Sequence, residues 1–204
     1  MLLSIDPDYP ESHLVHQVVV QLERDGVVIL PTDTVYALVC DLHSRKAIQK
    51  LTKLKGGKRR KLFSIILADL SEMGTYASDV SSYAYRTMKR LLPGPYTFVV
   101  PASNTIPKLM HTKRRTIGIR VPECPIALDV ARQLGRPLVA TTLGIGEEEF
   151  LSNPWELEEE YGDQVALVVE GGVIYSEPSS VIDLSGRDPE IIREGKGDVS
   201  LFEG

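Results

Sequence analysis

Cysteine is scarce in this chain, which contains only Cys40 and Cys124 among its 204 residues. Their separation matches no metal-binding spacing, and two thiols without a secretory leader are typical of a reducing compartment. The first residues lack the basic and apolar segments of a signal peptide, and no apolar run approaches the length that spans a bilayer. These absences predict a cytoplasmic protein with no membrane partner.

Short catalytic and cofactor-binding motifs are also missing. The chain has no Walker-type phosphate loop, and no GxSxG, HExxH, CxxC or GxGxxG sequence occurs in a suitable context. The nearest match, Gly144-Ile145-Gly146, lacks a third glycine. His13 and His16 lie one helical turn apart, but no carboxylate or cysteine has matching spacing, which favours a solvated helix face over half of a metal site. The sequence predicts no metal site, and it assigns no catalytic residue by motif.

What remains is the composition of an ordinary globular protein. Apolar residues make up 43% of the chain, and the mean hydropathy is −0.05. This composition and the chain length predict one domain that spans residues 1–204. The net charge is −5, but six cations fall within residues 53–61, whereas acids concentrate at 147–149 and 156–160. The chain is therefore polarised into a basic segment and a more acidic remainder.

Hydrophobic periodicity switches between the helical and the strand pattern along the chain. Apolar residues at helical spacing predict helices over residues 11–25, 45–54, 70–92, 125–134 and 154–161. Short apolar runs predict strands over 2–5, 27–30, 63–67, 96–100, 116–121, 137–142, 165–169, 179–184 and 191–193. Because the last third is rich in strands, the expected fold is an α/β fold with a twisted mixed sheet of parallel and antiparallel strands and helices on its faces.

Hydroxyl side chains recur at the ends of three predicted strands. They are Thr32 and Thr34, Thr141 and Thr142, and Ser179 and Ser180. Arg120 lies inside an apolar strand, so its charge is either paired with an acid or directed at a ligand. Hydroxyls, backbone amides and cations bind phosphates and carboxylates. If these strand ends converge with Arg120, Arg193 and the lysines, the pocket will favour a nucleotide together with a small acid.

The segment Lys53–Lys61 is a dense basic stretch, with six cations in nine positions. It begins at the predicted end of the helix over 45–54, where one or two lysines would complement the helix dipole. The dipole does not account for six cations, so we expect the segment to bind the phosphates of a small ligand or a nucleic acid. Lys113-Arg114-Arg115 is a second basic group, which by itself is typical of a surface turn.

Ordered blocks along nearly the whole chain resemble the YrdC-like family. The first is the run 28–38, which reads VILPTDTVYAL. Further blocks are LKG at 54–56, LPGPYT at 92–97, GIRVP at 118–122, PLVAT at 137–141, SSVID at 179–183 and REG at 193–195. Within that family, Thr75-Tyr76, Tyr96-Thr97-Phe98 and the ending GKGDV at 195–199 are most similar to the YciO branch.

The resemblance implies a twisted α/β sheet with a positively charged concave cavity, and it implies ties to RNA, either tRNA or double-stranded RNA. The best-known members of the family make threonylcarbamoyl-AMP from L-threonine, bicarbonate and ATP, and they release pyrophosphate. Their product is used to modify adenosine in tRNA. ATP would bring Mg²⁺ as part of the substrate complex, and no tightly bound cofactor is expected.

The resemblance also implies roles for individual residues. The threonine side of the cavity would be lined by Thr32, Thr34 and Tyr36. Lys55 would meet the nucleotide phosphates, and the nucleotide and carbamate side would be completed by Arg120, Thr142, Ser180 and Arg193. RNA would contact the basic segment through Lys53, Lys58, Arg59, Arg60 and Lys61.

Three positions depart from the pattern of the synthases. Gly57 stands in place of the arginine of a Lys-x-Arg motif, Gly144 in place of the asparagine of a Ser-x-Asn motif, and Ile66 in place of a histidine. Each lost donor costs about 2.7–4 kcal/mol of transition-state stabilisation in a closed site. The leading hypothesis is therefore a protein that binds RNA and nucleotide without making the adenylate. The alternatives are an active threonylcarbamoyl-AMP synthase and a hydrolase of a related threonylcarbamoyl nucleoside.

Overall fold

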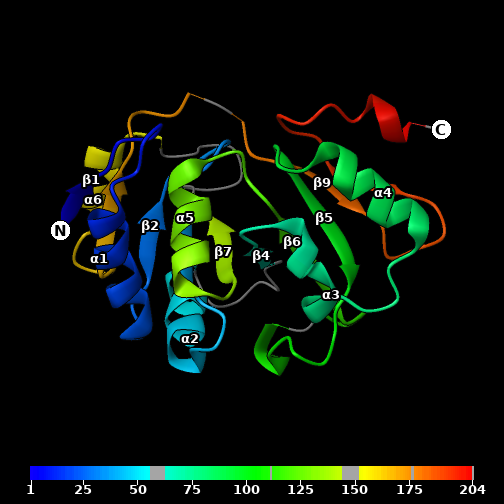
Figure 1. Cartoon of the computed structure of the whole chain (residues 1–204), viewed down its shortest axis with the longest axis horizontal. Helices are drawn as coiled ribbons and strands as arrows, with labels where there is room; N and C mark the ends of the chain where they lie inside the picture. Colours follow the sequence, from blue (N-terminus) through cyan, green and yellow to red (C-terminus); the bar gives the residue numbers. More distant parts are fainter. Residues whose placement is uncertain (56–62, 111, 144–151, 176, 204) are drawn as a thin grey trace.

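The fold is built on one mixed β-sheet that runs through the molecule (Figure 1). The computed structural model describes residues 1–55, 63–110, 112–143, 152–175 and 177–203. In this part of the chain ten strands form the sheet, in the order β1-β8-β2-β3-β7-β4-β6-β5-β9-β10. The strands are β1 (Leu2–Ser4), β2 (Val28–Leu30), β3 (Ala37–Asp41), β4 (Ser64–Ile66), β5 (Tyr96–Pro101), β6 (Thr116–Arg120), β7 (Leu138–Thr142), β8 (Leu167–Glu170), β9 (Ser180–Asp183) and β10 (Glu190–Arg193).

The sheet contains both parallel and antiparallel pairs of strands. The pairs β1–β8, β2–β8, β4–β6 and β5–β9 are parallel. The pairs β2–β3, β3–β7, β4–β7, β5–β6 and β9–β10 are antiparallel. The mixed sheet predicted from the sequence is therefore confirmed, and its non-sequential order brings the end of the chain beside β5.

Helices cover both faces of the sheet. On one face α1 (Ser12–Glu23) packs against α5 (Pro125–Leu134), and both share an apolar cluster with Val28 and Leu30. On the other face α2 (Arg45–Leu54) and α4 (Ser82–Leu91) share a second cluster with Ile29 and Leu38, which Leu157 of α6 (Pro154–Tyr161) joins. Successive residues of β2 thus point to opposite faces, as strand geometry requires.

The remaining elements are short. They are η1 (Leu70–Glu72), α3 (Met73–Tyr76), η2 (Lys108–Met110) and η3 (Ser200–Phe202), where η marks a 3₁₀ helix. Across the described ranges, no helix combines the length and the apolar composition that crossing a membrane would require.

Two sequence expectations need correction. The predicted strands include none between 27–30 and 63–67, but Ala37–Asp41 forms β3, which is buried throughout and pairs with both β2 and β7. The predicted helix over 70–92 is divided: Ala77 pairs with Ala102 in an isolated bridge, and Ser81 caps a new helix by accepting a hydrogen bond from the backbone N–H of Ala84. A serine cap of this kind starts a helix rather than continuing one.

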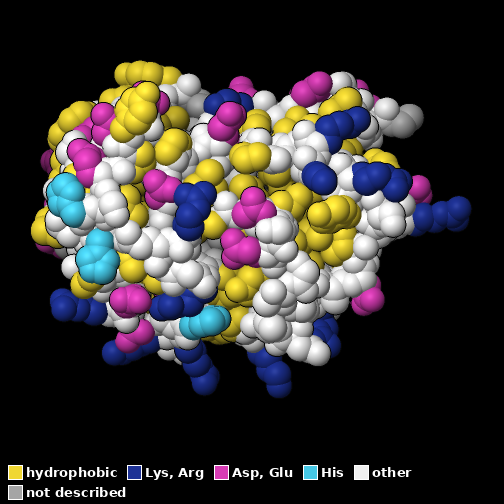
Figure 2. Space-filling model, viewed as in Figure 1, with side chains coloured by type: hydrophobic (Ala, Val, Ile, Leu, Met, Phe, Trp, Pro, Cys, Tyr) yellow, Lys and Arg dark blue, Asp and Glu magenta, His cyan; other side chains and the backbone are white. Residues whose placement is uncertain are grey.

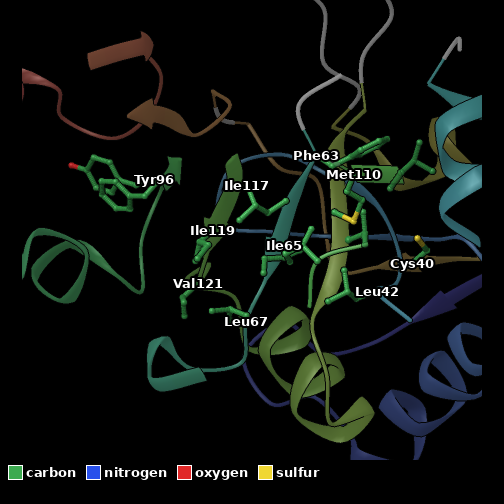
Figure 3. Close-up of a cluster of buried hydrophobic side chains, with 14 of the residues drawn as sticks. Cys40, Leu42, Phe63, Ile65, Leu67, Tyr96, Met110, Ile117, Ile119 and Val121 are labelled. Carbon is green, nitrogen blue, oxygen red and sulfur yellow. The ribbon is translucent and has the colours of Figure 1, made fainter. Parts of the chain in front are cut away.

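Alternation in β4 and β6 decides where the cavity lies. Ile65 of β4 and Ile117 and Ile119 of β6 point into the larger apolar cluster (Figure 3). Their neighbours Ser64 and Gly118 consequently face the opposite side of the sheet. At these two positions the sheet therefore presents small and polar groups on that side.

Candidate functional site

The candidate site is a cavity of about 450 Å³ on the polar side of the sheet. Strands β3, β4, β5, β6, β7, β9 and β10 all contribute to its wall, so residues from positions 37 to 193 meet there. Its size falls within the range of small-molecule sites, which usually measure about 300–1,000 Å³.

Gly118 forms a narrow part of the cavity wall. A Cβ atom built at Gly118 would lie 3.0 Å from Cγ2 of Thr97 and 3.1 Å from Cβ of Ser64. All three residues line the cavity, on the adjacent strands β6, β5 and β4. The absent side chain therefore keeps open the space between two flanking hydroxyl residues.

Paired hydroxyls line the part of the cavity formed by β5, β6 and β9. Thr97 Oγ1 and Ser179 Oγ lie 2.9 Å apart, and Thr112 Oγ1 and Thr116 Oγ1 also lie 2.9 Å apart. In each pair either hydroxyl can act as the donor. Hydroxyl pairs of this kind can reorient to donate to an anion or to accept from an amino group.

Arg120 is the buried cation of the site. Its side chain is only 6% exposed, and its Nη2 donates to Asp33 Oδ1 at 2.8 Å and to Thr34 Oγ1 at 3.0 Å. Burial lowers the pKa of Arg120, and the charge of Asp33 opposes that shift. Within the described residues, Nε of Arg120 and Oδ2 of Asp33 have no hydrogen-bond partner although both are buried. Unsatisfied buried groups at a cavity wall are what a ligand or ordered water would complete.

Two further cations reach the cavity from other elements. Arg193 of β10 donates to the carbonyl oxygen of Ser179 from Nη2 at 2.7 Å and from Nε at 3.1 Å. Burial, and then the charge of Arg120, lower the pKa of Arg193. Lys55, which follows α2, donates from Nζ to the carbonyl oxygen of Thr142. The effect of Arg120 on Arg193 indicates that the two guanidinium groups are electrostatic neighbours.

The structure brings together part of the predicted site. Lys55, Arg120, Thr142 and Arg193 all line the cavity. Thr32 and Thr34 are buried next to it and act through Arg120, because Thr34 Oγ1 accepts from the guanidinium and lies 3.0 Å from Thr32 Oγ1.

Two residues that were predicted to contact the ligand lie outside the described cavity wall. Tyr36 is fully buried, and its hydroxyl donates to the Gly172 carbonyl at 2.7 Å and accepts from the Gly171 N–H at 3.2 Å. Ser180 is also fully buried, and its Oγ donates to the Gly197 carbonyl at 2.5 Å and accepts from the Gly195 N–H at 3.0 Å. Neither is part of the described cavity wall, so each holds a neighbouring backbone segment in place.

Other predictions fall elsewhere. Lys53 lies exposed on the last turn of α2, away from the cavity wall. Ile66 is fully buried in the apolar cluster that α1 and α5 share, beside Arg120 in the β4–β6 register, and it does not line the cavity. Outside the described residues lie Gly57, Lys58, Arg59, Arg60, Lys61 and Gly144.

Several lining residues were not singled out from the sequence. They include Phe63, Ser64, Thr97, Thr112, Thr116 and Gly118. Strand alternation could have found some of them, because Thr97 lies between the core residues Tyr96 and Phe98, and Gly118 lies between Ile117 and Ile119.

Comparison with known proteins identifies relatives over most of the chain. The model of the Sua5/YciO/YrdC family, described as "Telomere recombination", matches residues 20–195. The YciO protein of Escherichia coli K12 is 38% identical over 200 residues, which cover 97% of each chain. The crystal structure of E. coli YciO superposes with a TM-score of 0.94, at 36% identity, over 99% of this chain and 98% of that one.

More distant relatives carry a named activity or ligand. The threonylcarbamoyl-AMP synthase of Vibrio vulnificus YJ016 is 28% identical over 88% of this chain and 97% of its own. Sua5 of Pyrococcus abyssi, in a crystal structure with L-threonine, has a TM-score of 0.92 at 23% identity, over 100% of this chain and 60% of that one, which shows a shared fold. From the family match and the identity to YciO, this chain belongs to the Sua5/YciO/YrdC family.

Proposed function

We propose that this protein binds an adenine nucleotide and a small carboxylic acid together in the cavity, and that RNA is its macromolecular partner. The observation that carries the proposal is the convergence of Lys55, Arg120 and Arg193 on one cavity. ATP would enter as its Mg²⁺ complex, and L-threonine with bicarbonate is the corresponding pair of small acids.

The charge of the cavity wall supports an anionic ligand. Among the described residues that line it, three are cations and none is an acid. Because Asp33 pairs with Arg120, the positive charge that we propose for the cavity comes mainly from Lys55 and Arg193. Guanidinium groups bind phosphates and carboxylates through paired N–H donors, and Arg193 brings such a group to the cavity wall.

The relatives support the same ligand chemistry. A threonylcarbamoyl-AMP synthase aligns with 88% of this chain, and the Pyrococcus abyssi relative of the same fold was crystallised with L-threonine. In this chain, the hydroxyls of Thr97, Ser179 and Thr142 would bind the polar atoms of the small acid and the ribose or phosphates.

RNA is proposed because basic side chains gather on α2, the helix that leads to Lys55 in the cavity wall. Helix α2 exposes Arg45, Lys46, Lys50 and Lys53, and it is followed by Lys55 in the cavity wall. The segment that carries Lys58, Arg59, Arg60 and Lys61 continues this charge in the sequence. A polyanion such as tRNA or double-stranded RNA would be attracted to such a stretch, with an affinity that falls as salt rises.

Calorimetric titration tests the small-ligand part of the proposal. We expect the purified protein to bind ATP with Mg²⁺, and Arg193→Gln to weaken that binding by about 10-fold or more, because a hydrogen bond to a charged group contributes about 1.5–3 kcal/mol. Arg187→Gln, an exposed arginine before β10, is the control and should bind like the wild type. Absence of ATP binding in the wild-type protein would refute the proposal.

The second candidate is an active threonylcarbamoyl-AMP synthase, which the 28% identity over 88% of the chain favours. It is tested by pyrophosphate release from ATP in the presence of L-threonine and bicarbonate. We expect background turnover even at high protein concentration, because Gly57 and Gly144 remove two donors of the synthase pattern. Release that depends on both acids would establish the synthase instead, and release of threonine from a threonylcarbamoyl nucleoside would establish the hydrolase.

A further inference from the structure

The outward face of α4 combines exposed aromatic rings with exposed cations. The inward residues Ala84, Thr87 and Met88 are buried against the sheet. The outward side carries the exposed side chains of Arg86, Lys89 and Arg90. Tyr83 and Tyr85, which are 46% and 41% exposed, flank these cations on opposite edges of that side, because residues two apart lie about 200° apart around a helix. The helix contains no acid.

The positions of these residues place rings and cations side by side. Tyr83 and Arg86 are three residues apart, and Tyr85 and Lys89 are four apart, so each tyrosine has a cation one turn further along the helix. Figure 2 shows Lys and Arg side chains interspersed with apolar-coloured ones over the area where Figure 1 draws α4, with few acids nearby.

The helix itself does not account for this arrangement. Lys89 and Arg90 lie in the last turn, where they complement the helix dipole. Arg86 lies a turn earlier, and two large rings at this exposure add nothing to a dipole. Within the described residues, Arg86, Lys89 and Arg90 make no ion pair. In the part of the chain that the structure describes, the face therefore carries three cations without an ion-pair partner next to exposed ring surface.

We propose that this face of α4 binds single-stranded RNA, with bases stacked on Tyr83 and Tyr85 and phosphates held by Arg86, Lys89 and Arg90. Exposed aromatic rings beside cations are the arrangement by which proteins hold unpaired nucleic acid. A protein partner would have to be acidic to satisfy these charges, whereas one RNA strand supplies both bases for the rings and phosphates for the cations. The inference rests on the RNA partnership proposed above, and it specifies an unpaired segment as the ligand of α4.

The α4 face and the cavity lie on opposite sides of strand β5. Tyr96 and Phe98 of β5 share an apolar cluster with Met88 of α4, whereas Thr97 and Val99 line the cavity. RNA on α4 would therefore leave the cavity open, so the two ligands can be bound at the same time and measured independently.

Fluorescence anisotropy tests the proposal by comparing the affinities for a labelled single-stranded RNA and for a duplex of the same length. A length of about 12 nucleotides is within the usual span of such sites. Tyr83→Ala/Tyr85→Ala should weaken single-strand binding by about 30-fold or more and change duplex binding little. Arg86→Gln/Lys89→Gln should lower the slope of log affinity against log salt by about 0.7 for each lost phosphate contact. Melting temperatures verify that both variants fold.

Matched controls carry the same changes elsewhere on the surface. Tyr9→Ala/Tyr175→Ala removes two tyrosines that are 82% and 90% exposed, and Lys108→Gln/Arg187→Gln removes two exposed cations. If the α4 variants bind single-stranded RNA as tightly as these controls, the proposal is wrong. ATP titration of the same samples separates this outcome from failure of the cavity function, because α4 variants should bind ATP like the wild type. A wild-type protein that binds ATP but no RNA would overturn the α4 proposal and leave the small-ligand function standing.

Discussion

Arg120 and Asp33 form an ion pair that is almost completely buried, with Nη2 and Oδ1 2.8 Å apart and side chains 6% and 7% exposed. The two residues are 87 positions apart, on β6 and in the loop between β2 and β3. The pair fixes a guanidinium at the cavity wall, and Asp33 holds it there at the cost of desolvating both charges.

Asp33→Ala should destabilise the protein by about 3–5 kcal/mol, because it leaves the buried charge of Arg120 without its partner. Urea denaturation measures the loss. The double variant Asp33→Ala/Arg120→Met should recover much of it, since the uncompensated charge is then gone.

The exposed pair Arg132–Asp129 on α5 provides the control, because its side chains are the same types but remain largely in water. Asp129→Ala should cost about 1 kcal/mol or less. Equal losses for the two aspartate variants would show that the Arg120–Asp33 pair does not behave as a buried one.

Gly118→Ala should reduce ATP binding in the cavity more than it reduces stability. The added Cβ would lie 3.0 Å from Thr97 and 3.1 Å from Ser64, so these neighbours must shift or the new methyl group narrows the cavity. Overpacking of this kind lowers the free energy of unfolding by about 1–3 kcal/mol. Calorimetric titration with ATP and urea denaturation measure the two effects. Gly74→Ala is the matched control, since nothing lies within 4 Å of its added Cβ. Undiminished ATP affinity in Gly118→Ala would place the nucleotide elsewhere.

Local chemistry made some elements predictable to the residue. The helix over 45–54 is predicted from its apolar spacing, and in the structure Ser44 caps it by accepting a hydrogen bond from the Ala47 N–H. The helix over 125–134 is predicted in the same way, and in the structure it begins at Pro125 and ends before Gly135, which adopts the left-handed conformation at φ 70°. In both cases a cap residue and an apolar stripe indicate the same boundaries.

Other elements could not be predicted from the sequence because they depend on pairing with distant parts of the chain. Strand β3 was missed because Ala37–Asp41 is buried on both faces between β2 and β7, and so it lacks the alternation of a half-exposed strand. At the site, the residue types at positions 36 and 180 were informative, but their direction depends on distant partners. Tyr36 reaches Gly172, which is 136 residues away, and no local pattern encodes that contact.

Ser180→Ala should loosen the segment 194–198. The substitution removes the acceptor for the Gly195 N–H and the donor to the Gly197 carbonyl, and leaving buried groups unpaired costs about 1–3 kcal/mol each at most. Hydrogen exchange followed by mass spectrometry should show faster exchange in peptides covering 194–203, with β5 protected as before. Ser82→Ala, an exposed serine on α4, is the control and should leave exchange of that segment unchanged. Unchanged exchange in Ser180→Ala would mean that the segment is held by its other contacts, such as Tyr96 Oη with the Asp198 carbonyl.

Tyr36→Phe should make the free energy of unfolding less dependent on pH in alkaline solution. Burial raises the pKa of Tyr36 to about 12, whereas in the unfolded chain a tyrosine titrates near about 10. Between these values the unfolded state releases the proton and the folded state keeps it, so the contribution of Tyr36 to stability is complete below about pH 10 and is lost as the pH rises toward 12. The wild-type free energy of unfolding, measured by urea denaturation from neutral pH upward, should therefore fall more steeply across this window than that of Tyr36→Phe. At neutral pH the variant is less stable, because its ring no longer bonds Gly171 and Gly172, so the two curves converge as the pH rises.

Tyr9→Phe is the control, because the ring of Tyr9 is exposed, and this variant should follow the wild-type curve. If the curves of Tyr36→Phe and the wild type run parallel, the phenol of Tyr36 titrates alike in the folded and unfolded states.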